Sequence, residues 1–352
     1  MTALKDLLIR QIEATGPLTI AEYMTTCLLH PVHGYYTTRD PLGAAGDFTT
    51  APEISQMFGE MVGLCLAQSW LDQGAPNPFV LAELGPGRGN LMADILRATR
   101  AVPGFHAAAQ LHLIEASPAL QAEQATRLPQ AQWHTDISSL PDGPVFLVAN
   151  EFFDALPIRQ FQRDGAGWRE RMVGLEDGKL TVGLSSTAPL DALAHRLDDT
   201  QDGQMVETSA PACAIAAQIG TRISEQGGVA LLIDYGGWHS IGDTFQALEH
   251  HSYADPLAHP GQADLTAHVD FEALALAAAP AQHAKLCPQG VFLERLGITA
   301  RAQALATQLS GEALEAHIAA HRRLTHPEEM GSLFKILALF PTSAPVPAGC
   351  EP

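Results

Sequence analysis

The sequence contains no uninterrupted apolar run approaching the roughly 18 residues that a membrane-spanning helix requires, so we expect no membrane insertion. Cysteine is sparse. The five cysteines are scattered and form no CxxC pair, which argues against the usual zinc and redox motifs and favours reduced packing residues. The first ten residues lack the features of a secretory signal or of a transit peptide. We therefore expect a cytoplasmic protein of bacterial type.

Basic side chains are also few. The chain has 20 Lys and Arg against 39 Asp and Glu, which gives a formal charge of −19. No Lys/Arg cluster offsets this charge, so a phosphate backbone would be repelled and no nucleic acid partner is expected. A negative surface suits a basic protein segment, although its commonest meaning is solubility.

Strands and helices alternate from residue 79 onward, which is typical of a parallel sheet covered by helices on both faces. A hairpin around the Asp164-Gly165 turn interrupts this pattern. We predict an α/β fold with a doubly wound sheet. The expected elements are strands 79–84, 111–115, 132–134, 144–150 and 228–234 and helices 90–100, 118–128 and 211–225.

The rest of the chain is predicted to be mainly helical. Thr19-Ile20-Ala21-Glu22 is a capping-box pattern that begins a second N-terminal helix. A polar, His-rich loop is expected at 238–267, and the proline-rich end is expected to be disordered. The predicted parts are an N-terminal helical lid (1–75), a core (76–237), a helical substrate-side insertion (238–330), a final core strand (331–340) and a disordered tail (341–352).

A glycine-rich loop, Gly85-Pro86-Gly87-Arg88-Gly89, joins the first predicted core strand to the next helix. Glycines at this point allow the backbone to approach a ligand closely, so Gly85 and Gly87 are candidate cofactor-binding residues. The alternative is that the glycines only let a helix pack on the sheet.

Acidic residues stand at the ends of three successive predicted strands. Glu83 precedes the loop, where it would repel a pyrophosphate but suits the positive amino group and sulfonium of S-adenosylmethionine. Glu115 can accept hydrogen bonds from both ribose hydroxyls, and Asp136 can meet the adenine amino group. Together they outline one nucleoside, so S-adenosylmethionine is the predicted cofactor. The alternative for Glu115 and Asp136 is a helix cap or a solvated loop.

The fourth predicted strand ends in Asn150-Glu151-Phe152-Phe153-Asp154. The carboxyl ends of strands hold ligands in open α/β sheets, so catalytic groups are expected there. Paired carboxylates grip a guanidinium group bidentately, and Glu151 and Asp154 are the candidate catalytic pair. The alternative is that Asn150 and Asp154 cap the following helix.

These residues resemble the MidA-like methyltransferases, whose animal members are mitochondrial assembly factors for respiratory complex I. The resemblance implies a class I, Rossmann-like methyltransferase with a seven-stranded sheet, an added helical subdomain and an N-terminal helical lid. For the mitochondrial members it implies symmetric arginine dimethylation. The motifs that carry it are Gly46 to Glu60, the glycine loop, Asn150 to Gln160, Ile233 to Gly236, Gly261 to Phe271 and Met330 to Lys335.

The resemblance also assigns site residues. Thr49 and Pro52, with Glu53, are implied to fold over the cofactor, while Tyr36 and Phe48 line the acceptor channel or pack the lid. The implied cofactor-binding positions are Glu83, Gly85, Gly87, Glu115, Asp136 and Asn150.

No metal site is predicted, although Asp264, His268 and Asp270 lie close together in the sequence. Thr266 or Asp270 is expected to begin a helix there, and no other His or Cys lies at ligand spacing.

Three functions remain open from the sequence. The first is methylation of an arginine on a protein partner. The second is an assembly chaperone that binds S-adenosylmethionine with little catalysis, and the third is methylation of a small molecule. The apolar face of the predicted helix 54–71 is compatible with a homodimer.

Overall fold

The computed structural model describes residues 3–38, 50–249 and 252–351. The chain divides into two compact units, and each is made of three segments. The core unit comprises Thr49–Phe153, Cys213–Trp238 and Phe271–Pro352. The accessory unit comprises Met1–Phe48, Asp154–Ala212 and His239–Asp270.

The core unit is built on a sheet with the strand order β15-β17-β10-β5-β2-β3-β4. Neighbouring strands from β4 to β10 are parallel, and β17 is antiparallel to both β10 and β15. This confirms the predicted doubly wound seven-stranded path. The strands are β2 (Phe79–Leu84), β3 (Ala109–Ile114), β4 (Gln132–His134), β5 (Val145–Asn150), β10 (Gly228–Gly237), β15 (Gln282–His283) and β17 (Phe334–Phe340), and β16 (Cys287–Pro288) also pairs with β17.

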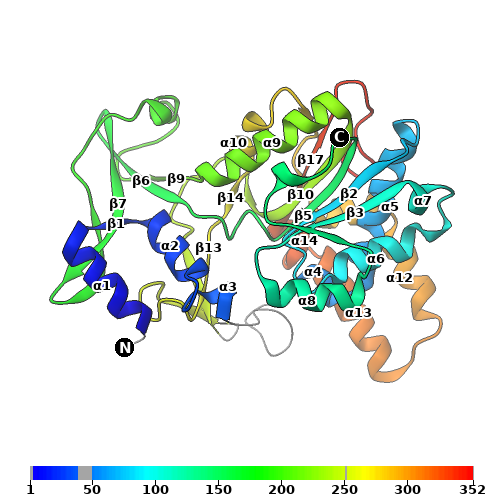
Figure 1. The fold of residues 1–352 in the computed structure, drawn as a ribbon, viewed down its shortest axis with the longest axis horizontal. Coiled ribbons are helices and arrows are strands. Elements are labelled where there is room, and N and C mark those ends of the chain that lie inside the picture. Colours follow the sequence, from blue (N-terminus) through cyan, green and yellow to red (C-terminus); the bar gives the residue numbers. More distant parts are fainter. Residues whose placement is uncertain (1–2, 39–49, 250–251, 352) are drawn as a thin grey trace. The chain divides into compact units, whose positions relative to one another are not determined.

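Helices cover both faces of this sheet (Figure 1). α9 (Ala210–Gln226) and α10 (Phe271–Ala277) lie on one side, and α5 (Gln56–Asp72) and α6 (Asn90–Ala98) lie on the other. The strand order reverses at β2, which has β3 on one side and β5 on the other. Ligands of open α/β sheets bind at such a reversal, beyond the carboxyl ends of the strands.

The apolar face of α5 is buried inside the core unit. Gly59 allows α6 to approach, since a Cβ atom there would lie 2.6 Å from the Cβ of Asp94. Glu60 is 4% exposed and pairs with both Arg97 and Arg301 at 2.6 Å. The apolar face that was compatible with a homodimer is therefore used within the chain, and it gives no support to a dimer.

The C-terminal part of the core unit is helical and ends in an ordered segment. The predicted disorder of 341–352 is wrong for the described residues, which end at 351. Cys350 is 1% exposed, and Gly349 packs so closely on Phe292 that a Cβ atom would lie 2.8 Å from its ring. The helices are α11 (Gln289–Arg295), α12 (Ile298–Ala306), α13 (Gly311–Thr325) and α14 (Met330–Leu333).

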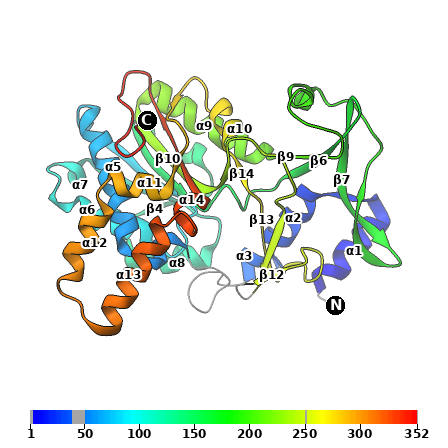
Figure 2. The ribbon, with the colours of Figure 1, turned by 180° about the vertical axis from the view of Figure 1, so that it is seen from behind.

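The accessory unit is a mixture of helices and short sheets (Figure 2). The predicted capping box is confirmed, because the Thr19 and Glu22 side chains each bond to the other's backbone N–H. The hairpin through Gly165 is also confirmed. The elements are α1 (Ala3–Thr15), β1 (Leu18–Thr19), α2 (Ile20–Leu29), α3 (Tyr35–Thr38), β6 (Arg159–Asp164), β7 (Gly167–Glu176), β8 (Lys179–Leu184), β9 (Met205–Thr208), β11 (Gln246–Glu249), β12 (Ser252–Ala254) and β13 (Asp264–Thr266).

The unit boundaries differ from the predicted ones. The predicted lid 1–75 is divided near residue 48, because α5 belongs to the core. The predicted helical insertion 238–330 is divided after Asp270. Its first part is a three-stranded sheet in the accessory unit, and its second part packs as helices in the core unit.

None of the described helices is long and apolar enough to cross a membrane.

Candidate functional site

The glycine loop lies between β2 and α6, as predicted. Gly85, Gly87 and Gly89 have φ angles of +60°, +53° and +77°, a conformation that other residues adopt at a cost. A Cβ atom on Gly85 would lie 2.9 Å from the Phe152 ring. The loop therefore needs glycine both for its backbone angles and for its packing beside the end of β5.

Two buried acceptors lie on one face of the sheet at this edge. Glu83 on β2 pairs in register with Val148 on β5, so Asn150, two residues further along β5, faces the same side. Within the described residues, Glu83 Oε2 and Asn150 Oδ1 are buried and have no hydrogen-bond partner. Such acceptors are costly to bury unless a donor reaches them. A cationic amino group fits this requirement.

Burial raises the pKa of Glu83 to about 8, with a smaller contribution from the charge of Glu115. A hydrogen bond from the Met92 backbone acts in the opposite direction. A cation placed beside Glu83 would lower its pKa and favour the carboxylate.

Glu115 follows β3 and is 9% exposed. Its Oε1 accepts a hydrogen bond from Ser117 N at 2.8 Å, and its Oε2 accepts one from Gln124 Nε2 at 3.2 Å. Burial raises the pKa of this carboxyl group above its ordinary value.

Asp136 lies beyond β4 and is exposed. It caps the short 3-10 turn Ile137–Ser139 by accepting a hydrogen bond from Ser138 N at 2.9 Å. The capping alternative thus describes its local contacts, and its contact with adenine stays a prediction.

Glu151 follows β5 in a left-handed backbone conformation, with φ at +51°. Its Oε1 accepts hydrogen bonds from Ala51 N and Asn150 Nδ2, both at 3.2 Å. Non-glycine residues held at positive φ cost about 1–3 kcal/mol and cluster at functional sites. The backbone strain is a signal that the sequence pattern could not give.

The short helix α4 (Ala51–Ile54) makes two contacts with the site. Its first backbone N–H donates to Glu151, and Glu53 lies 4.0 Å from Arg88 of the glycine loop. Pro52 is in its first turn. Thr49 and Phe48, which were predicted to lie near the cofactor and the acceptor, fall outside the described residues.

Asp154 belongs to the accessory unit, whereas Glu151 belongs to the core unit. Within the accessory unit, Tyr36 donates a hydrogen bond from its hydroxyl group to Asp264 Oδ1 at 2.8 Å. Burial, followed by the charges of Asp264 and Asp154, raises the pKa of Tyr36 well above its ordinary value. The structure thus groups Tyr36, Asp154 and Asp264.

Two further residues shape the core site. Asp234 is 1% exposed and accepts hydrogen bonds from Phe153 N at 3.0 Å and Tyr235 N at 2.9 Å. It lies on β10, in one of the motifs that carry the family resemblance, so the strand-end rule could have identified it. Gln124 in α8 (Pro118–Arg127) contacts both the loop and Glu115, and no sequence pattern indicated it.

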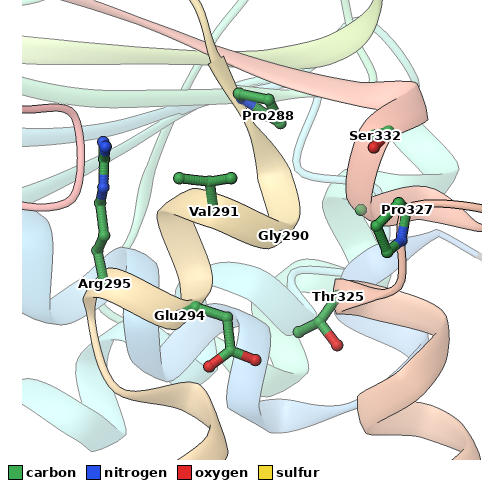
Figure 3. Close-up of a pocket in the computed structure, with 9 residues that line it drawn as sticks. Pro288, Gly290, Val291, Glu294, Arg295, Thr325, Pro327 and Ser332 are labelled. Carbon is green, nitrogen blue, oxygen red and sulfur yellow. The ribbon is translucent and has the colours of Figure 1, made fainter. Parts of the chain in front are cut away.

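A hollow of about 510 Å³ lies in the C-terminal part of the core unit (Figure 3). Its lining residues come from β16 and α11 and from the chain between the end of α13 and α14. They include Pro288, Val291, Pro327 and Ser332 and none of the predicted site residues. Among the described residues, no group of three or more His, Cys, Asp or Glu side chains could hold a metal.

A doubly wound sheet, a glycine loop at its reversal point and buried acceptors that suit a cationic amino group together fit an S-adenosylmethionine-dependent methyltransferase. A family model of S-adenosyl-L-methionine-dependent methyltransferases matches residues 61–288, and the chain belongs to this family. Its cofactor is S-adenosylmethionine. In the solved structures, a Burkholderia thailandensis protein bound to S-adenosyl-homocysteine is 27% identical with a TM-score of 0.81, covering 99% of this chain and 93% of its own.

Curated relatives match nearly the whole chain. The protein arginine methyltransferase NDUFAF7 of Danio rerio is 38% identical over 95% of this chain and 86% of its own length. The Homo sapiens protein of the same name is 36% identical over 95% of this chain and 82% of its own length. Both are named as mitochondrial proteins, and this finding contradicts the prediction of a cytoplasmic bacterial protein.

Proposed function

We propose that the protein transfers a methyl group from S-adenosylmethionine to an arginine side chain of a protein. The observation that carries this proposal is Glu151, a carboxylate held in a strained backbone conformation at the carboxyl end of β5. The names of the relatives, which are protein arginine methyltransferases, support the same acceptor.

In this proposal the core unit holds the cofactor. Glu83 and Asn150 receive its amino group, because their buried oxygens lack a donor within the described residues. Glu115 receives the ribose hydroxyls, and Gly85 and Gly87 let the backbone approach. Asp136 meets the adenine amino group, and Pro52 folds over the cofactor. When bound, the cofactor supplies an electrophilic methyl group on a positively charged sulfur.

Glu151 acts on the acceptor. A carboxylate can orient a guanidinium group through charge-assisted hydrogen bonds and raise the electron density on the reacting nitrogen. It would take the proton that this nitrogen loses as the new N–C bond forms and the S–C bond of the cofactor breaks. In the accessory unit, Tyr36 donates a hydrogen bond to Asp264, and the parts of Asp154 and Tyr36 in binding the acceptor stay predictions from the sequence.

Incubation of the protein with methyl-labelled S-adenosylmethionine and a cell extract tests the proposal. We expect label in the protein fraction, and a loss of at least about 100-fold in Glu151→Gln, because general acid–base catalysis contributes about 10²–10⁴-fold. Label confined to small molecules or nucleic acid would overturn the proposal.

A matched control is Glu176→Gln, an exposed carboxylate at the end of β7. It should leave the labelling unchanged. Equal labelling by the parent and Glu151→Gln would show that Glu151 has no catalytic part. Absence of labelling by the parent would favour a chaperone with little catalysis.

A further inference from the structure

Helix α8 and the residue that follows it contact three successive residues of the glycine loop. Gln124 Nε2 donates to Gly87 O at 2.7 Å, and Arg127 donates to the carbonyl oxygen of Arg88. A Cβ atom on Gly89 would lie 3.1 Å from Leu128, the residue that follows the helix. The loop is therefore supported from the α8 side over its whole second half.

Gln124 also connects this loop to the next strand end. Its side chain is fully buried, and the same Nε2 lies 3.2 Å from Glu115 Oε2. Its Oε1 accepts a hydrogen bond from the Trp133 indole at 2.8 Å. Because an indole nitrogen can only donate, Trp133 fixes which end of the amide faces it. The Nε2 group must then point to Gly87 and Glu115.

We propose that Gln124 is a positioning residue for cofactor binding, which holds the Glu115 carboxylate and the Gly87 carbonyl in the arrangement that receives the ribose. This inference rests on the proposed role of Glu115. An amide donor also suits Glu115 electrostatically, since the hydrogen bond stabilises the charged form of a buried carboxylate. Trp133 acts one step further away, by fixing the Gln124 amide.

The neighbouring Gln121 offers a matched comparison. It lies one turn earlier in α8 and donates to the backbone carbonyl of Glu115 at 2.8 Å rather than to the carboxylate. Gln121→Leu therefore removes the same group from the same helix and leaves the orientation of the Glu115 side chain intact.

Calorimetric titration with S-adenosylhomocysteine measures the effect on affinity. We expect Gln124→Leu to weaken binding about ten-fold, the size of one lost hydrogen bond to a charged group, and Gln121→Leu to change it less than about two-fold. Trp133→Phe should also weaken binding. It keeps Gln124 in place, so it carries the test if Gln124→Leu does not fold.

The ratio of adenosine affinity to 2′,3′-dideoxyadenosine affinity separates positioning from general support. Positioning through Glu115 predicts that Gln124→Leu lowers this ratio, and that adding Gln124→Leu to Glu115→Gln lowers it little further. Equal weakening of both nucleosides, or additive effects of the two substitutions, would overturn the inference. Absence of S-adenosylhomocysteine binding by the parent would instead remove the proposed function, on which the inference rests.

Discussion

The buried carboxyl group of Glu83 should lose a proton when the cofactor binds. Its pKa of about 8 in the unliganded protein means that about nine in ten molecules carry it protonated at pH 7. A cationic amino group selects the carboxylate, so binding should release about 0.9 proton at pH 7 and close to one proton at pH 6. Affinity should rise close to ten-fold from pH 6 to pH 7.

Calorimetry with S-adenosylhomocysteine in buffers of different ionisation enthalpy measures this proton release. Glu83→Gln, which cannot titrate, should bind more weakly and release at least about half a proton less at pH 7. Either of two results would contradict a protonated Glu83 in the unliganded protein: no proton release by the parent, or equal proton release by the parent and Glu83→Gln.

Glu83→Gln should weaken cofactor binding but increase the stability of the folded protein. The pKa of Glu83 is higher in the folded protein than in the unfolded chain, so its contribution to stability is complete below about pH 4.5 and is lost as the pH rises through about 8. At pH 8 Glu83→Gln should therefore be more stable than the parent by about 4 kcal/mol, because raising the pKa from 4.5 to about 8 corresponds to about 1.4 kcal/mol for each pKa unit. Denaturant unfolding at pH 5 and pH 8 checks this, because the gain should be smaller at pH 5.

Substitutions at three other positions should change the stability of the protein through packing or charge. Gly85→Ala should destabilise the protein by about 1–3 kcal/mol more than Gly165→Ala in thermal unfolding, because both have φ at +60° but only the Cβ at Gly85 meets Phe152. Glu60→Gln should cost about 1.5–3 kcal/mol in urea unfolding, since it removes the buried carboxylate that accepts charge-assisted hydrogen bonds from two half-exposed arginines; an unchanged free energy of unfolding would contradict this. Burial lowers the pKa of His112 to about 4, so the stability that its neutral form contributes should be lost as the pH falls from about 6.5 towards 4. In denaturant unfolding, the free energy of unfolding of His112→Asn should therefore change less with pH over that range than that of the parent.

The core strands could be predicted closely from the sequence. Strand 79–84 matches β2 to the residue, because a fully buried parallel strand is a continuous apolar run. Strand 132–134 also matches β4 to the residue, although β4 is partly exposed, because it follows a predicted helix in the regular alternation. The accessory sheets were largely missed. Residues 238–267 were expected to form a polar loop, yet β11 and β13 pair there with only Ala247 and Leu265 as strongly buried apolar side chains. Their backbone hydrogen bonds are non-local, so local composition gives little sign of them.

The candidate site was predictable where one rule applies to one strand end. Glu83 lies near the end of β2, and Glu115 and Glu151 directly follow β3 and β5, so the rule places all three at one edge of the sheet. The role of Gln124 was not predictable, because it depends on how α8 packs on the glycine loop. The strain at Glu151 was equally hidden, since a positive φ angle leaves no mark on the sequence.

Peptide mass spectrometry of the labelled protein product identifies the residue that receives the methyl group. We expect the transferred methyl group on arginine, and we expect no modified peptide when Glu151→Gln replaces the parent. A methyl group found on lysine or on a carboxylate, or formed equally well by Glu151→Gln, would contradict this expectation.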